Sequence, residues 1–207
     1  VQCDIRDEAQ IQQSVDKAVA TFGGIDILIN NASAISLTPT EKTEPKRFDL
    51  MHDINVRGTF FMSRACIPHL RKGTNPHILT LSPPINLDMK WFKDHIAYTL
   101  SKYNMTMIAL GLAAELKNDG IAANALWPQT TIATAAVQNL LGGDMLINMS
   151  RTTDIIADAA YYILSKPSRE CTGNAFIDEQ VLAAEGITDL SKYSVVPGAK
   201  LYNDLFL

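Results

Sequence analysis

Apolar residues recur at the three- and four-residue spacing of a helix in several long stretches of this 207-residue chain. In the first of them Ile11, Val15 and Val19 fall four residues apart, and Gly23-Gly24 follows as an end signal. The same spacing predicts helices over 8–22, 44–71, 94–118 and 154–166, and a shorter one within 132–150.

Short apolar runs bounded by turn residues stand between the helical stretches and indicate strands. The run at 25–29 is apolar at nearly every position, which suits a strand buried on both faces of a parallel sheet. Residues 1–3 are expected to be a strand end and 179–207 an irregular tail. The strands are predicted over 25–29, 77–82, 121–126 and 174–178. Because strands and helices alternate, residues 1–207 are predicted to form one α/β domain, a Rossmann-like doubly wound parallel sheet.

The composition is that of a globular protein, with 47% apolar and 19% charged residues and a formal net charge of −4. The lack of a basic excess argues against nucleic acid as a partner, and no apolar run approaches the roughly 18 residues of a membrane span. Cys3, Cys66 and Cys171 form no CxxC pair, which favours free thiols in a reducing, intracellular compartment. The four histidines have no metal-ligand spacing, so no metal site is predicted.

Three residues suited to ligand binding or to a sharp turn lie directly after predicted strands. They are Asn30, Ser82 and Pro128. Because the carboxyl ends of parallel strands meet at one edge of the sheet, where ligands bind in such folds, these residues are expected to lie near one another. The sequence therefore predicts a site at this edge.

Tyr98 and Lys102, one helical turn apart, supply a candidate proton donor and its activator. A free tyrosine has a pKa of about 10, so work near neutral pH requires lowering it by roughly 3 units. A lysine on the same helix face can supply that field, and the Ser82 hydroxyl could hold a carbonyl oxygen beside the phenol. A second pair with the same spacing, Tyr162 and Lys166, follows no strand end and precedes a proline, which favours a surface helix end.

In their order along the chain, these motifs resemble the short-chain dehydrogenase/reductase family over roughly residues 1–180. The matching pieces are Asp4, NNAS at 30–33, Asn55 in DINVRG, the Tyr98–Lys102 pair and NALWP at 124–128. The resemblance implies that Tyr98 and Lys102 are the catalytic pair, that Asn55 holds a relay water and that Ser82 orients the carbonyl. It implies cofactor contacts from Asp4, Asn30, Ala32, Tyr98, Lys102, Pro128 and Ile132, with Ser33 and Thr134 as weaker candidates.

The chain departs from the family pattern in three places. The first strand and the Gly-rich turn that cradles a pyrophosphate are absent, so a preceding segment of roughly 50–60 residues is predicted. Ser82 lies 16 residues before Tyr98, against about 13 in the pattern, and is followed by Pro83. Gln129 stands where glycine usually permits close backbone approach to a ligand.

The sequence predicts an NAD(P)-dependent oxidoreductase that interconverts an alcohol and a carbonyl by hydride transfer, with Tyr98 as proton donor or acceptor. The cofactor is expected to be NADP or NAD, with NADP slightly favoured. The expected partners are a small carbonyl or alcohol, lipid-like molecules included, and further copies of the chain in a homodimer or homotetramer. The resemblance implies a cytoplasmic location for a bacterial protein and a peroxisomal or mitochondrial one for a eukaryotic protein.

Two alternatives remain open. Pro83 and Gln129 would suit a weakly active or inactive module of the same fold that binds a dinucleotide or a lipid. A scaffold that dimerises through helices 44–71 and 94–118 is the third possibility.

Overall fold

A computed structural model describes residues 1–207, and a four-stranded parallel sheet forms their centre. The strands are β1 (Ile27–Asn30), β2 (His77–Leu81), β3 (Ala122–Trp127) and β4 (Ala175–Ile177), in the order β1-β2-β3-β4. Each neighbouring pair is parallel, and the register places Asn30 beside Thr80 and Thr80 beside Ala125. The predicted parallel α/β sheet is therefore confirmed.

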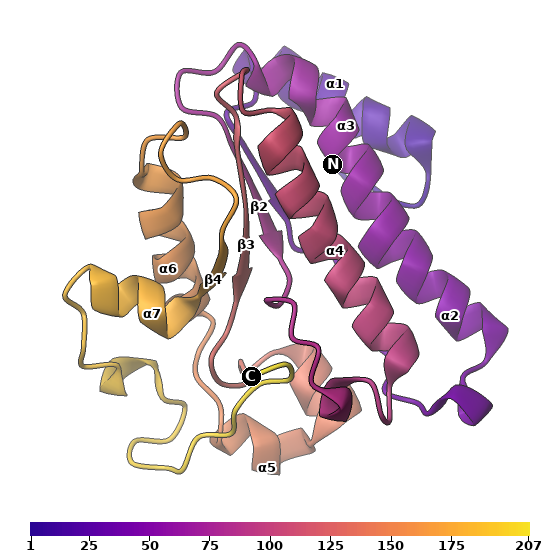
Figure 1. The fold of residues 1–207 in the computed structure, drawn as a ribbon, viewed down its shortest axis with the longest axis vertical. Helices are drawn as coiled ribbons and strands as arrows, with labels where there is room; N and C mark the ends of the chain where they lie inside the picture. The colour runs from indigo at the N-terminus through magenta and orange to yellow at the C-terminus, as the bar shows by residue number, and fades with distance from the viewer.

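Helices cover both faces of this sheet (Figure 1). On one side lie α1 (Glu8–Phe22), α2 (Pro45–Met51), α3 (Thr59–Leu70) and α4 (Ile96–Glu115). On the other side lie α6 (Asp154–Ser165) and α7 (Asp178–Ala184), while α5 (Gly143–Asn148) lies beyond the carboxyl ends of the strands. Ile78 packs with Leu112 of α4 and the adjacent Leu79 packs with Ile163 of α6, so successive strand residues are buried on opposite faces.

The N-terminal part of the chain follows simple capping rules. The Asp7 carboxylate accepts hydrogen bonds from the backbone N–H groups of Ala9 (2.8 Å) and Gln10 (3.2 Å), which makes Asp7 the N-cap of α1. Gly23, with φ of 85°, ends the helix in the left-handed conformation that glycine adopts at little cost. Residues 1–3 are not a strand, contrary to the prediction, because no other strand lies beside them to accept ladder hydrogen bonds.

The predicted helix over 44–71 is interrupted by a π-helical segment, His52–Gly58, between α2 and α3. Pro45 lies in the first turn of α2, where its missing N–H is tolerated. A π segment adds a residue to the turn and redirects the side chains after it, and such segments are frequent at functional sites. Here it places Asn55, which is fully buried, toward α4.

The segment 179–207 was predicted to be irregular, and this is wrong for its first part. It contains most of α7 and a short 3₁₀ turn, Ser191–Tyr193. Val181 and Leu182 are both buried against α6, and this tertiary burial stabilises a helix too short to form alone. The last residues return to the carboxyl ends of the strands, where Figure 1 places the C-terminus.

The edge strand β1 has one side without a neighbour. Ile27 is 45% exposed and Ile29 is 47% exposed, although both belong to an apolar strand.

No helix of the fold combines the length and the apolar character that crossing a bilayer requires.

Candidate active site

Tyr98 and Lys102 lie in the first turns of α4 and are almost fully buried, with 5% and 2% of their surface exposed. α4 runs antiparallel to the strands, so its N-terminal turns lie at the carboxyl ends of the sheet (Figure 1). Both side chains therefore lie at the edge where ligands bind in open α/β sheets. Their helical spacing puts them on the same face, as predicted.

The Lys102 ammonium is held by neutral groups. Its Nζ donates to the Leu81 carbonyl oxygen at 2.7 Å, lies 3.5 Å from Ser33 Oγ, and lies 5.0 Å from the centre of the Trp127 ring. No carboxylate comes within ion-pair distance of this ammonium. Burial consequently lowers the pKa of Lys102 to about 7, and the nearby Asp204 opposes that shift only in part.

This buried lysine gives stability a pH dependence. An unfolded lysine has a pKa of about 10.4, so between pH 7 and 10 the unfolded chain binds more protons at this position than the folded chain. Stability must then rise with pH in that window. We expect the unfolding free energy of the wild type to gain up to about 1.4 kcal/mol per pH unit relative to Lys102→Met.

Urea titrations at pH 7.5, 8.0, 8.5 and 9.0 (about half a unit apart) would measure this difference. Asp204 does not cancel in this comparison, because Lys102 lowers the pKa of Asp204, so both proteins are compared with Asp204→Asn in place. Equal slopes in the two proteins would show that Lys102 keeps an ordinary pKa.

The environment of Tyr98 departs from the sequence-based expectation. Burial raises the pKa of the Tyr98 phenol above its usual value, and the negative charge of Asp204 raises it further. The expectation of a lowered pKa is therefore wrong for the site as it stands, because the Lys102 ammonium donates to Leu81 and does not hydrogen-bond the phenol. A catalytic phenol needs either a nearer cation or more water than this closed arrangement supplies.

Asn55 fastens the π segment to two neighbouring elements. Its Oδ1 accepts from the Ala34 N–H at 2.7 Å, and its Nδ2 donates to the Ala34 carbonyl (2.9 Å) and to Ser101 Oγ (2.9 Å). Ser101 immediately precedes Lys102. Asn55 therefore sets the distance between the loop after β1 and the turns of α4 that carry Tyr98 and Lys102.

Ser82 is the first residue after β2, and its side chain is fully buried. The Thr106 hydroxyl on α4 lies 2.8 Å from Ser82 Oγ and 2.6 Å from the Pro83 carbonyl oxygen. The structure thus brings Ser82 to the correct end of the sheet but turns its hydroxyl toward the helix. To reach a substrate this hydroxyl would have to leave Thr106.

The predicted cofactor residues differ in how far they are exposed. Asn30 is buried, and its amide donates to Ser63 Oγ at 3.0 Å, which makes it a tie between β1 and α3. Ala32 is exposed at the same strand edge, and Pro128 is buried in the loop after β3. Two further candidates, Ile132 and Thr134, lie further along that loop, and Ile132 is buried against Tyr193.

Asp4 lies in the segment before α1, which contacts the π segment through the Arg57 guanidinium and the Arg6 carbonyl at 2.7 Å. Its carboxylate pairs with Arg6 at 2.6 Å, and the hydrogen bonds from Arg6 lower the pKa of Asp4 to about 2. It does not cap α1, since Asp7 does. Its side chain is 39% exposed and so remains accessible to a ligand at this edge of the molecule.

Sequence reasoning missed the contribution of the last residues and of Asp178. The Asp178 carboxylate accepts from the Gln129 N–H at 2.8 Å, and its burial raises its pKa to about 6. Asp204 approaches the same loop, because its N–H donates to the Gln129 carbonyl at 3.1 Å. Burial raises the pKa of Asp204 to about 7, against the attraction of Lys102. No local pattern in the sequence signals that residues 102, 178 and 204 converge.

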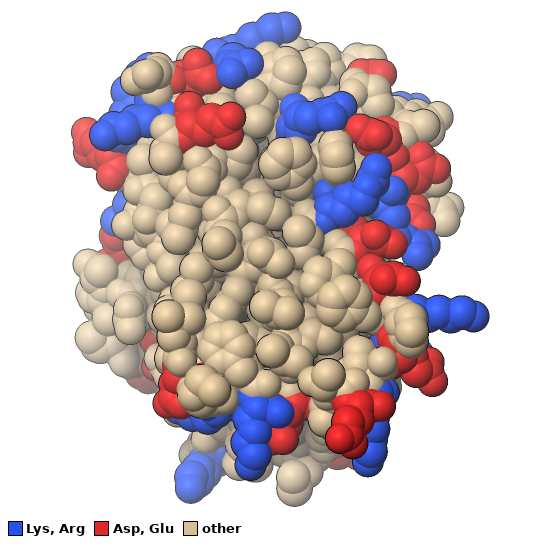
Figure 2. All heavy atoms as spheres, turned by 45° about the vertical axis from the view of Figure 1, so that its right-hand side comes forward, with Lys and Arg blue, Asp and Glu red and all other residues tan.

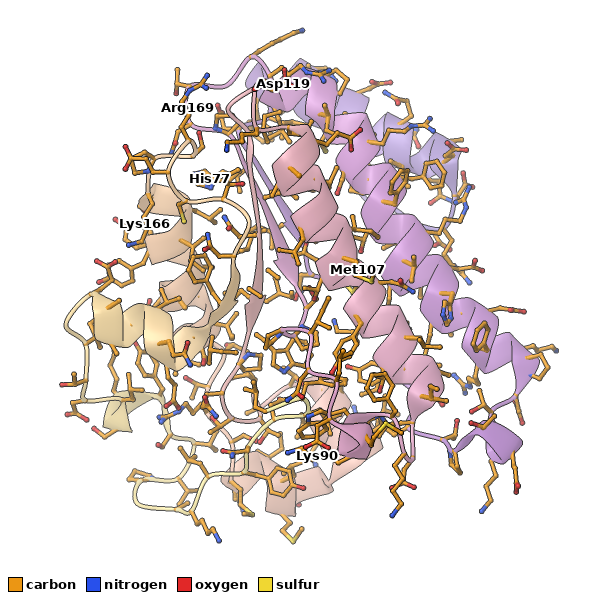
Figure 3. All side chains as sticks on the ribbon, in the orientation of Figure 1. His77, Lys90, Met107, Asp119, Lys166 and Arg169 are labelled. Atoms are coloured by element: carbon orange, nitrogen blue, oxygen red, sulfur yellow. The ribbon has the colours of Figure 1, made fainter.

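The second Tyr-x-x-x-Lys pair lies elsewhere. Lys166 follows α6 and lies near His77, at the opposite end of the sheet from Lys90 in the 83–93 loop (Figure 3). Its ammonium pairs with Glu185 at 2.6 Å. Tyr162, on α6, packs against the apolar cluster between this helix and the sheet. The Tyr162 and Lys166 side chains therefore have a structural role.

No group of three or more histidine, cysteine or carboxylate side chains in the fold is arranged to bind a metal ion.

Known proteins resemble this chain along nearly its whole length. The family model described as Enoyl-(Acyl carrier protein) reductase matches residues 1–178. Hydroxysteroid dehydrogenase-like protein 2 of Xenopus tropicalis is 58% identical over 204 residues, which are 99% of this chain and 48% of that protein. The chain therefore spans about half the length of this relative.

Solved structures agree with that match. A short chain dehydrogenase from Mycobacterium thermoresistibile is 55% identical with a TM-score of 0.92, over 99% of this chain and 72% of that one. A 3-ketoacyl-(acyl-carrier-protein) reductase from Brucella melitensis, complexed with NADH, is 28% identical with a TM-score of 0.72, over 86% and 75% of the two chains.

Proposed function

This chain belongs to the short-chain dehydrogenase/reductase family of oxidoreductases, and from that premise we propose that it interconverts an alcohol and a carbonyl compound with a nicotinamide dinucleotide. Tyr98 and Lys102 carry the proposal, because they lie one turn apart, buried, at the carboxyl ends of the strands. The family resemblance inferred from the motifs is confirmed, whereas the roles of individual residues stay predictions.

The residues at this edge fit the nicotinamide end of such a cofactor. Lys102 Nζ and Ser33 Oγ lie 3.5 Å apart and offer donors to the hydroxyl groups of a ribose. Pro128 and the Gln129 backbone would form a wall beside the ring.

The chemistry divides between cofactor and protein. When bound, the dinucleotide supplies or accepts the hydride. Tyr98 donates a proton to the carbonyl oxygen in reduction and takes one from the hydroxyl in oxidation. The positive charge of Lys102 stabilises the phenolate form of Tyr98. Asn55 keeps the catalytic turns at their distance from the β1 loop, and its binding of a relay water stays a prediction, as does a contact of Ser82 with the carbonyl.

The non-catalytic alternative has specific support in the raised pKa of Tyr98 and in the Ser82 hydroxyl that faces Thr106. Calorimetry of the full-length protein with NADH and with NADPH, followed by turnover assays on ketones and alcohols, separates the two functions. Cofactor binding together with turnover supports the oxidoreductase. Tight binding without turnover on any compound supports the binding module.

We also propose self-association through the outer face of α4. Figure 2 shows an uncharged surface along this side of the molecule, with charged side chains gathered around it. Met107 is 58% exposed, and the neighbouring Leu100 and Leu110 are exposed as well. A Cβ on Gly111 would meet nothing within 4 Å, so a second helix could approach closely there.

Met107→Lys should convert a dimer into monomers or a tetramer into dimers, because it buries an unpaired charge in the apolar contact. Light scattering of the full-length protein would measure the change. Leu140→Lys is a matched control, since Leu140 is also an exposed apolar residue, 65% exposed, but lies in the segment Val137–Leu141 beyond α4. A wild-type monomer would exclude this proposal and the scaffold function with it.

A further inference from the structure

The last residues of the chain cover the catalytic tyrosine. Phe206 is fully buried, and the centre of its ring lies 6.1 Å from that of Tyr98 and 5.2 Å from that of Tyr103. Three further aromatic rings surround it at 5.7–6.2 Å, those of Trp91, His95 and Trp127. We call these five rings around Phe206 the aromatic box.

The segment that carries Phe206 is attached by a few hydrogen bonds, two of which are from the Tyr202 N–H to the Met149 carbonyl (2.9 Å) and from Asn86 Nδ2 to the Phe206 carbonyl (3.4 Å). Asn203 pairs with Thr130 in a single antiparallel bridge, which the hydrogen bonds Thr131 N–H to Tyr202 O (2.9 Å) and Asp204 N–H to Gln129 O (3.1 Å) flank. Beyond the bridge, Trp127 Nε1 donates to the Leu205 carbonyl at 2.9 Å. These few bonds are the kind that a local opening can break without disturbing the sheet.

The backbone at Phe206 is strained. Its φ of 78° makes it the one residue other than glycine with a positive φ in the chain. Aromatic residues rarely adopt this conformation, and it persists only where the surroundings enforce it. The packing of the ring in the aromatic box provides that enforcement, so the ring and the strained backbone are coupled.

The position of the box identifies what it could bind. Loop 83–93 and the start of α4 provide Trp91, His95 and Tyr98, whereas Lys102 reaches from the same helix toward Leu81 and Ser33. Phe206 therefore packs against the Tyr98 ring together with Trp91 and His95. Access to Tyr98 from the loop side is closed while the Phe206 ring fills this space.

We propose that the aromatic box is the subsite for the apolar part of the carbonyl substrate, and that residues 202–207 unpair from 129–131 to withdraw Phe206 and admit it. This inference rests on the proposed oxidoreductase function. Flat aromatic walls favour an uncharged substrate with a ring-sized apolar group beside its carbonyl. A carboxylate would lose its hydration among these aromatic walls without gaining a partner, so carboxylic acids are disfavoured.

Tryptophan fluorescence can report the exchange without any turnover, because Trp91 and Trp127 both face the Phe206 ring. The bicyclic ketone trans-1-decalone, titrated into the full-length protein with cofactor present, should change this fluorescence saturably. Acetone and the keto acid levulinate should not do so at the same concentrations. An absent or equal response to all three compounds overturns the proposal.

Phe206→Ala removes the competing ring, so the apparent affinity for decalone should rise by about tenfold, as expected when the binding-competent fraction is no longer limiting. Tyr202→Ala is the matched control, since the Tyr202 side chain is 53% exposed in the same segment. An unchanged or weaker affinity in Phe206→Ala would show that Phe206 is a fixed wall.

A reversible disulfide tests the withdrawal itself. Residues 130 and 203 form the antiparallel pair between the two flanking hydrogen bonds, where Cα atoms lie about 4.5 Å apart, within the range that a disulfide spans. Thr130→Cys with Asn203→Cys should bind decalone when reduced and lose this binding when oxidised. Equal binding in both forms overturns the withdrawal. Fluorescence changes without turnover in any variant would instead refute the proposed oxidoreductase function and leave the subsite intact.

Discussion

Tyr98→Phe should lower the turnover of carbonyl reduction by about 10²- to 10⁴-fold, the usual contribution of a positioned proton donor. The change removes only the hydroxyl. Because the Tyr98 ring is held by aromatic packing against Phe206 and neighbouring residues, phenylalanine keeps these contacts and the fold. Steady-state kinetics of the full-length protein on a panel of ketones, with thermal unfolding measured in parallel, would separate lost chemistry from lost structure.

Tyr162→Phe is the matched control for this experiment. It changes the same residue type in the same Tyr-x-x-x-Lys spacing, but on α6, where Lys166 pairs with Glu185. Its turnover should equal that of the wild type. If Tyr98→Phe also kept full turnover, Tyr98 would not be the proton donor, and the non-catalytic function would become the better interpretation.

Much of the fold could be predicted because the central strands are buried. The run at 121–126 is apolar except at Asn124, and β3 is buried at every position. For the run at 25–29 the prediction of burial on both faces is wrong, because β1 is an edge strand in which Ile27 and Ile29 are exposed. Helix α1 has the predicted bounds, because Asp7 and Gly23 mark its ends chemically. The parallel topology then brings the carboxyl ends of the strands to one edge of the sheet. Tyr98, Lys102 and Pro128 can be placed at this edge without any knowledge of side-chain contacts.

The parts that escaped prediction depend on contacts between distant residues. α7 forms because Val181 and Leu182 meet α6, and no propensity in the sequence marks a helix there as stable. The buried position of Phe206 depends on aromatic side chains from α4, β3 and the 83–93 loop. The raised pKa of Tyr98 follows from that burial and from Asp204, which lies more than 100 positions away in sequence.

One departure from the family pattern, Gln129, lies in a loop that two acidic residues contact. Gln129 stands in place of glycine. Its backbone N–H donates to the Asp178 carboxylate, and its carbonyl accepts from the Asp204 N–H. The same loop pairs with the segment that carries Phe206. Glycine is valued where a ligand approaches the backbone closely. Here two acidic residues of the chain, Asp178 and Asp204, bind the backbone at this position instead, so the loop after β3 is tied to the segment that carries Phe206.

Asn55→Ala should lower the free energy of unfolding by about 2–4 kcal/mol, because it leaves the Ala34 N–H, the Ala34 carbonyl and the Ser101 hydroxyl without their partner. Alanine has the better helix propensity, which offsets only a few tenths of a kcal/mol. Turnover should fall as well, since Ser101 adjoins Lys102. Equilibrium unfolding in urea would measure the first effect, and kinetics below the unfolding range the second.

Two further variants give the loss of stability expected when none or only one of these hydrogen bonds is broken. Asn148→Ala changes an exposed asparagine at the end of α5 and should stay within about 0.5 kcal/mol of the wild type. Ser101→Ala breaks only one of the three bonds of Asn55 and should cost about 1 kcal/mol. This graded series follows if Asn55 links the β1 loop to α4. An Asn55→Ala protein as stable as Asn148→Ala would mean that other contacts hold the catalytic turns in place.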